Sequence, residues 1–204
     1  MKVLATVPFA HVMRHFAAEH PLDGEYEENT DDEAEEHLHQ AELLLGRWHR
    51  VLLDRDDVLS VMLPWHLGEG GEHELIPKTG LSVRDAVSRL RAAGEGYARS
   101  NPVCGRKLGL QAASALTPVF LSTRAVPGVD YEGLPAGDRL THLDGLHRML
   151  AWELHGRLAA GTPMEAYVAG APQELPPRGD PLAPADVRHG AGHDRDALDV
   201  HPTG

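Results

Sequence analysis

Cysteine is almost absent from this chain of 204 residues, which contains a single one, Cys104. One thiol cannot form a disulfide bond within the chain, and it cannot provide a zinc site built from cysteines alone. The sequence therefore excludes an internal disulfide framework and a cysteine-only zinc site.

Long apolar segments are missing as well. No stretch approaches the roughly 18 consecutive apolar residues that a membrane-spanning helix needs. The segment from Met1 to Pro8 carries one lysine and a short apolar run, and charged residues and histidines follow at once, which is not typical of a secretory signal. We therefore expect a cytoplasmic protein without a membrane partner.

Positive charge is scarce, because 19 Lys and Arg residues face 31 Asp and Glu residues and give a formal net charge of −12. Affinity for nucleic acids comes mainly from Lys and Arg that neutralise phosphates, so a nucleic-acid partner is disfavoured. A local basic pocket for a small molecule is compatible with this balance. The length and the hydrophobic fraction of 42% predict one domain with appendages.

Hydrophobic periodicity predicts an α+β fold with a small mixed sheet. Strands are expected at 2–7, 58–63, 118–124, 139–143 and 164–169. Helices are expected at 9–19, from a Thr30–Glu33 capping box onward with apolar spacing that continues to Leu52, at 83–93 after a Ser82 cap, and at 146–155. Residues 94–116 show no clear pattern, because Gly96, Pro102, Gly105 and Gly109 interrupt it.

Fourteen histidines are spread along the chain. His11 and His15 share one face of the first predicted helix, a spacing that can bind a metal, but Val12 stands where a metalloprotease helix has glutamate. His37 and His39 lie beside the acidic start of the second helix. Surface or partly buried histidines are the favoured interpretation of all four.

A basic patch of Arg99, Arg106 and Lys107 stands out in the otherwise acidic chain. Two interpretations are open, a solvated loop or a lid that brings positive charge to a ligand, and the solvated loop is favoured.

The segment Asp144-Gly145-Leu146-His147-Arg148 is the strongest functional signal. A strand leads into a glycine and then a helix, and the first amides of a helix have no partner within it and attract anions. Arg148 can add a bidentate contact to phosphate oxygens, and His147 can donate a hydrogen bond. The alternative is structural, with Asp144 as a helix cap and Arg148 paired to a carboxylate.

The order of four segments resembles the ParB/sulfiredoxin superfamily. These segments are the strand at 118–124, the segment from His142 to Arg148, the apolar helix ended by Gly156, and the strand that contains Glu165-Ala166-Tyr167-Val168. The resemblance is clearest over 117–169 and extends back to Glu74-Leu75-Ile76-Pro77. It implies a small α+β domain whose loop binds nucleotide phosphates. Leu146 stands where sulfiredoxin has its reactive cysteine, and no basic DNA-binding domain follows, so sulfiredoxin activity and chromosome partition are disfavoured.

The loop is most similar to that of the free-serine kinases, which implies a small-molecule phosphotransferase of bacterial specialised metabolism that uses ADP or ATP with Mg²⁺. The residues expected to bind the cofactor are Gly145, Leu146, His147, Arg148 and Lys78. The residues expected to act in catalysis are Asp144, His147 and Glu74, with Glu72 as a further candidate base.

Three alternatives stay open. The chain could be a non-catalytic nucleotide-binding regulator, a nuclease, or a metal-dependent biosynthetic enzyme that uses the N-terminal histidines His11, His15, His37, His39 or His49. In domain terms, we expect a helical extension with a short strand at 1–70, a ParB/sulfiredoxin-like domain at 71–170, and a disordered Pro-, Gly- and His-rich tail at 171–204.

Overall fold

The computed structural model describes residues 1–20, 32–68, 73–135 and 137–172. In this part of the chain, seven strands form a mixed sheet in the order β1-β2-β9-β7-β8-β3-β6, and β4 and β5 form a separate antiparallel pair. The strands are β1 (Lys2–Val7), β2 (Trp48–Leu53), β3 (Met62–Leu63), β4 (His66–Leu67), β5 (Glu74–Ile76), β6 (Leu81–Ser82), β7 (Val119–Ser122), β8 (Thr141–Asp144) and β9 (Met164–Ala169).

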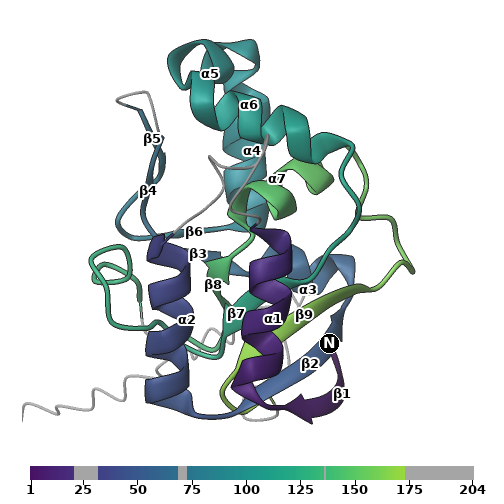
Figure 1. Cartoon of the computed structure of the whole chain (residues 1–204). Helices are drawn as coiled ribbons and strands as arrows, with labels where there is room; N and C mark the ends of the chain where they lie inside the picture. The colour runs from purple at the N-terminus through teal and green to yellow at the C-terminus, as the bar shows by residue number, and fades with distance from the viewer. Residues whose placement is uncertain (21–31, 69–72, 136, 173–204) are drawn as a thin grey trace, which may run out of the picture.

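Helices pack on both faces of this sheet. Figure 1 shows α1 and α2 on one face, while α4, α5, α6 and α7 gather at one end of the molecule. The helices are α1 (Phe9–Glu19), α2 (Asp32–Leu45), α3 (Arg55–Ser60), α4 (Val83–Ala93), α5 (Glu95–Ser100), α6 (Pro102–Ala112) and α7 (Leu146–Leu154). No helix in the described part of the chain is long and apolar enough to cross a membrane.

The central strands are buried on both faces, and alternate residues join different cores. In β7, Val119 and Leu121 pack with α4 and α7, whereas Phe120 packs with α1 and α2. In β9, Val168 joins the first core and Tyr167 joins the second. This period of two is the geometry of a strand, whose successive side chains point to opposite faces. The predicted α+β fold with a mixed sheet is confirmed.

Elements with strong local signals lie where the sequence predicts them. The strand at 2–7, the helix at 9–19 and the strand at 164–169 have the predicted bounds. The helix at 83–93 begins at Ser82, whose hydroxyl accepts a hydrogen bond from the Asp85 amide, and Gly94 ends it with a positive φ. The predicted Thr30 cap lies outside the described residues.

The prediction for residues 46–63 is wrong in two places. The second helix stops at Leu45 and does not continue to Leu52, because Gly46 takes a positive φ and the chain enters β2. The predicted strand at 58–63 is instead helix α3 followed by the two residues of β3. Asp54 and Asp57 form a reciprocal capping box that starts α3, and apolar content alone did not reveal it.

The unassigned stretch at 94–116 contains two helices, α5 and α6. The strands β1 and β2, which precede residue 70, lie in the same sheet as β7, β8 and β9. The segments before and after that predicted boundary therefore share one sheet. Most of the predicted tail, residues 173–204, lies outside the described residues.

The capping box at α3 gives a stability prediction. Asp54→Ala removes the side-chain acceptor of the Asp57 amide and should lower the free energy of unfolding by about 1 kcal/mol. Urea titration followed by circular dichroism measures this change. Asp56→Ala is the matched control, because Asp56 is exposed and pairs with the exposed Arg84. An equal loss in both variants would contradict the capping role.

Candidate functional site

A cavity of about 640 Å³ opens where the loop between β8 and α7 meets the end of α1, the start of α2 and one side of α6. Its volume is in the range of small-molecule sites. The walls include the predicted segment from Asp144 to Arg148, together with the histidines His20, His37, His66 and His142. The strongest sequence signal and several scattered histidines therefore face one space.

Gly145 shapes the floor of this cavity. Its φ of +103° is a left-handed conformation, and a Cβ at this position would lie 2.6 Å from Val119 Cγ1. Only glycine fits this turn without displacing β7. The turn delivers Leu146 and His147 into the first turn of α7, and both residues line the cavity.

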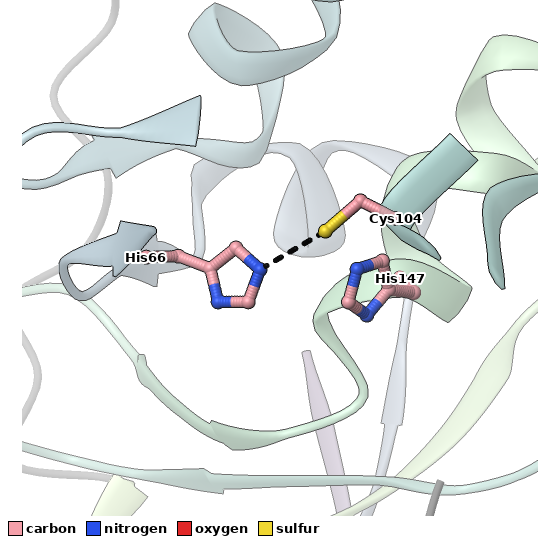
Figure 2. A group of neighbouring side chains, drawn as sticks. All are labelled: His66, Cys104 and His147. Carbon is pink, nitrogen blue, oxygen red and sulfur yellow. Dashed lines mark hydrogen bonds between the residues drawn. The ribbon is translucent and has the colours of Figure 1, made fainter. Parts of the chain in front are cut away.

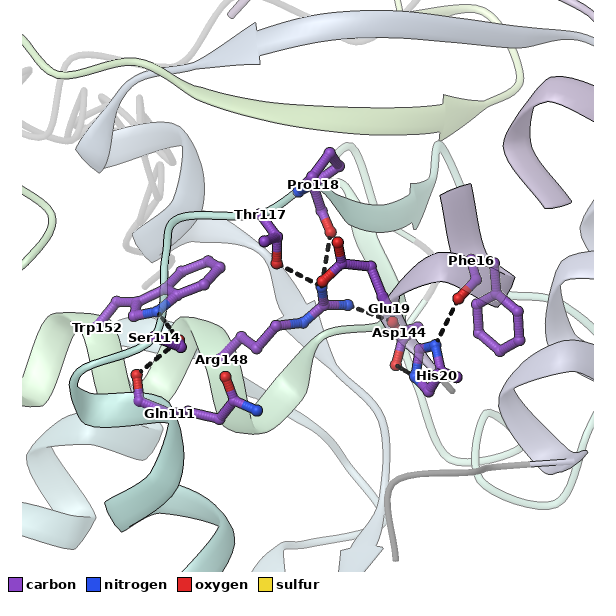
Figure 3. A network of polar contacts seen from close by, with 10 residues as sticks. All are labelled: Phe16, Glu19, His20, Gln111, Ser114, Thr117, Pro118, Asp144, Arg148 and Trp152. Atoms are coloured by element: carbon purple, nitrogen blue, oxygen red, sulfur yellow. Dashed lines mark hydrogen bonds and ion pairs between the residues drawn. The ribbon is translucent and has the colours of Figure 1, made fainter. Parts of the chain in front are cut away.

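Arg148 lies beneath the loop and is only 8% exposed. Its Nη1 donates to Glu19 at 3.1 Å, to the Thr117 hydroxyl at 2.9 Å and to the Pro118 carbonyl at 2.9 Å. Its Nη2 donates to the Asp144 carboxylate at 2.5 Å. Figure 3 shows the guanidinium enclosed by these acceptors. The terminal nitrogens of Arg148 are therefore already engaged by protein oxygens.

Asp144 is held by a guanidinium and an imidazole. Burial alone would raise its pKa, but the Arg148 charge and a hydrogen bond from His20 hold the pKa of Asp144 well below its usual value. His20 Nε2 lies 3.5 Å from the Asp144 carboxylate, and His20 Nδ1 lies 2.9 Å from the Phe16 carbonyl. Burial lowers the pKa of His20, yet the bond to Asp144 outweighs it and the pKa is raised. This aspartate is part of a paired network that joins α1 to α7.

His147 lies beside two groups that the sequence analysis did not connect with it. The potential ligand atoms of His66, Cys104 and His147 all lie within 4.8 Å of one another. Cys104 Sγ is 3.6 Å from His66 Nε2, and the rings of His66 and His147 are 5.3 Å apart and edge-to-face. Figure 2 shows these three side chains converging from β4, α6 and α7.

We call these three residues the His₂Cys cluster, and two of them lie in the first turns of helices. Cys104 is the third residue of α6 and His147 the second residue of α7. The positive end of a helix dipole stabilises a thiolate. Burial, with the charges of His66 and Lys107, lowers the pKa of His147 well below its usual value. The lowered pKa of His147 favours the neutral imidazole that binds metals.

His142, in β8, lines the cavity with ring nitrogens that lack hydrogen-bond partners among the described residues. The residue is 9% exposed. Burial lowers the pKa of His142 to about 3, and the charges of His37 and His66 act in the same direction. A buried polar group without a partner is costly, so His142 is a candidate for contact with a bound molecule.

The other predicted site residues lie elsewhere. Glu74 accepts a hydrogen bond from Trp65 Nε1 at 2.9 Å, and Lys78 Nζ lies 5.2 Å from the centre of the Trp65 ring. Within the described residues, the cavity wall includes Trp65 but neither Glu74 nor Lys78. Glu72 lies outside the described residues.

Only one of the predicted N-terminal metal ligands reaches the cavity among the described residues, and it is His37. His11 contacts the Tyr167 hydroxyl at 3.1 Å, His49 Nδ1 lies 3.4 Å from the Thr6 hydroxyl, and His39 lies 3.8 Å from Glu35. The favoured interpretation of the basic patch as a solvated loop is wrong for Lys107, which is 8% exposed and lines the cavity from α6.

Sequence analysis missed His66, Cys104 and His142 as site residues, and it named Lys107 only in the lid alternative that it did not favour. The one usable signal was Pro102-Val103-Cys104, a proline-started helix that places the single thiol in its first turn.

Comparison with known proteins gives a family and no function. A family model described as "Family of unknown function (DUF6309)" matches residues 1–186. Neither the curated proteins nor the solved structures contain a match to the chain.

The lowered pKa of His142 gives a prediction on acid stability. The unfolded chain binds a proton at His142 near the ordinary pKa of about 6.5, and the folded chain only near 3. Stability should therefore fall as the pH drops through this window, by up to about 1.4 kcal/mol per pH unit from this residue. His142→Phe should flatten the curve, measured by urea unfolding between pH 7 and pH 4. The exposed His155→Gln is the control, and an unchanged slope in His142→Phe would contradict the assignment.

Proposed function

Because the chain belongs to the DUF6309 family, a family of unknown function, we propose a function from the cavity itself: a metal-dependent enzyme that hydrolyses or hydrates a small anionic substrate. The observation that carries the proposal is the His₂Cys cluster, whose three ligand atoms lie within 4.8 Å of one another beside a cavity of about 640 Å³.

The donor set selects the class of metal. One thiolate and two imidazoles suit Zn²⁺ and other borderline transition metals, whereas Mg²⁺ prefers oxygen ligands. Catalytic zinc sites typically use three protein ligands and keep a fourth position for water or substrate. His66 and His147 both line the cavity, so the open side of such a site would face it. A bound ion would supply Lewis acidity and an activated water.

A cysteine nucleophile is the competing interpretation of the same cluster, because Cys104 lies 3.6 Å from a histidine nitrogen. A nucleophile must reach its substrate, but Cys104 is fully buried at 0% exposure and is not part of the cavity wall among the described residues. A nucleophilic pair also needs only one imidazole, whereas two converge here. Both points favour a metal centre.

The substrate class is inferred from the part of the wall where α6 meets α7, although the carboxylates of Glu19, Glu33, Asp130 and Asp144 also line the cavity. Lys107 is buried at 8% exposure and faces the cavity, and the first turn of α7 lies beside it. A buried ammonium group and helix amides both favour a negatively charged group. His142 holds a neutral imidazole at the wall, and its ring nitrogens can form hydrogen bonds to a bound molecule.

The phosphotransferase with ADP or ATP and Mg²⁺ stays a prediction, as does the resemblance to the ParB/sulfiredoxin superfamily. The phosphotransferase prediction is disfavoured by the positions of the side chains that were expected to bind phosphate or act as the base. Arg148 is engaged by Asp144 and Glu19, and Glu74 and Lys78 contact Trp65. The side chains that line the cavity therefore suit a metal-bound water better than a triphosphate.

Cobalt titration tests the metal centre. Untagged protein should bind Co²⁺ with a thiolate-to-cobalt charge-transfer band, and this band reports on Cys104 alone because the chain has one cysteine. Cys104→Ser should abolish the band. His66→Asn and His147→Asn should each weaken Co²⁺ binding more than about tenfold, since even outer-shell partners cost that much.

The exposed His155→Asn is the matched control and should bind Co²⁺ as the wild type does. Zinc-loaded wild type should also turn over members of a panel of small anionic esters and amides, and Cys104→Ser should not. A missing charge-transfer band in the wild type, or a band that survives in both histidine variants, would remove the metal centre and the function with it.

A further inference from the structure

A second group of ligand-type side chains lines the same cavity and shares no residue with the His₂Cys cluster. The potential ligand atoms of Glu33, His37 and Asp130 all lie within 4.8 Å of one another. Glu33 and His37 are four residues apart on α2, so they lie on one face of that helix. All three residues line the cavity. We call this group the acidic cluster.

The loop that carries Asp130 is fixed on both sides. The Trp65 amide donates to the Asp130 carbonyl at 3.0 Å. The hydroxyl of the next residue, Tyr131, donates to the His142 carbonyl at 2.9 Å. The Tyr131 ring also packs edge-to-face against His37, with ring centres 4.9 Å apart. The carboxylate and the imidazole are therefore held together by rigid neighbours, which is the preorganisation that an ion site needs.

His142 provides an independent sign of a ligand at this place. Its imidazole is nine-tenths buried, faces the cavity, and has no hydrogen-bond partner for either nitrogen in the described ranges. It lines the same cavity as His37 of the acidic cluster and His66 of the His₂Cys cluster. A neutral imidazole nitrogen is a common ligand for metal ions in proteins.

From this geometry we propose that Glu33, His37 and Asp130 form a second divalent-cation site in the cavity, with His142 beside it. Two carboxylates and one imidazole form a harder donor set than the His₂Cys cluster, and such a set suits Mn²⁺ or Fe²⁺. The enzyme then holds two metals of different class. This site uses its own ligands, so it does not depend on the proposed function.

Manganese binding tests the site, because free Mn²⁺ gives an electron paramagnetic resonance signal that disappears on binding. Untagged protein is first loaded with one equivalent of Zn²⁺ and then titrated with Mn²⁺. We expect one saturable Mn²⁺ per chain. Glu33→Gln and Asp130→Asn should each weaken Mn²⁺ binding at least tenfold, and Cys104→Ser should retain it.

Glu35→Gln is the matched control, because Glu35 lies on the same helix and interacts with His39 outside the cluster. Glu33 is exposed, so Glu33→Gln should fold as the wild type does, which circular dichroism verifies. The absence of saturable Mn²⁺ binding in the wild type, or an equal loss in Glu33→Gln and Glu35→Gln, would overturn the second site.

The two sites fail separately. An intact thiolate-to-cobalt band without Mn²⁺ binding overturns the second site and leaves the proposed function standing. Mn²⁺ binding without the cobalt band supports the second site and removes the proposed function.

Discussion

The buried guanidinium of Arg148 holds together the part of the fold that forms the cavity. A charge that leaves water is costly unless it is paired and hydrogen-bonded, and Arg148 meets this demand with Asp144, Glu19, Thr117 and the Pro118 carbonyl. These partners come from the end of α1, the entry to β7 and the end of β8. Their common pairing fixes the first turn of α7, and therefore the position of His147.

This pairing also affects which side chains of the cavity wall are available to a bound molecule. The negative charge of Asp144 raises the pKa of His142, whereas burial lowers it. Arg148 and His20 interact with Asp144, and burial has the larger effect on His142. Burial lowers the pKa of both His142 and His147, so they line the cavity as neutral imidazoles. A loop that could have offered an arginine to phosphate instead uses it internally and presents neutral nitrogen donors. The network thus occupies the arginine of an anion-type loop, which agrees with the metal centre that we propose and not with phosphate binding by Arg148.

How much the sequence predicts depends on whether a feature is local. The helices at 9–19 and 83–93 and the strand at 164–169 follow from short-range spacing and caps, and the segment from Asp144 to Arg148 is contiguous. The same reasoning gave the wrong elements for residues 46–63, because their apolar residues suit helix and strand alike. Gly46 and the Asp54 cap determine where the helices end and begin there. The His₂Cys cluster could not be predicted from local sequence patterns, because even its two members closest in sequence, His66 and Cys104, are 38 positions apart.

The glycines that hid α6 from the sequence analysis are partly responsible for the site that α6 builds. A Cβ at Gly105 would lie 2.9 Å from the Ala98 backbone, so only glycine lets α6 approach α5 this closely. Gly105 directly follows Cys104, and the close approach fixes the turn that carries the thiol. A larger residue at Gly105 would meet Ala98 and require α6 and α5 to shift apart. The glycine that interrupts the helical pattern in the sequence is therefore the residue that permits this close packing beside Cys104.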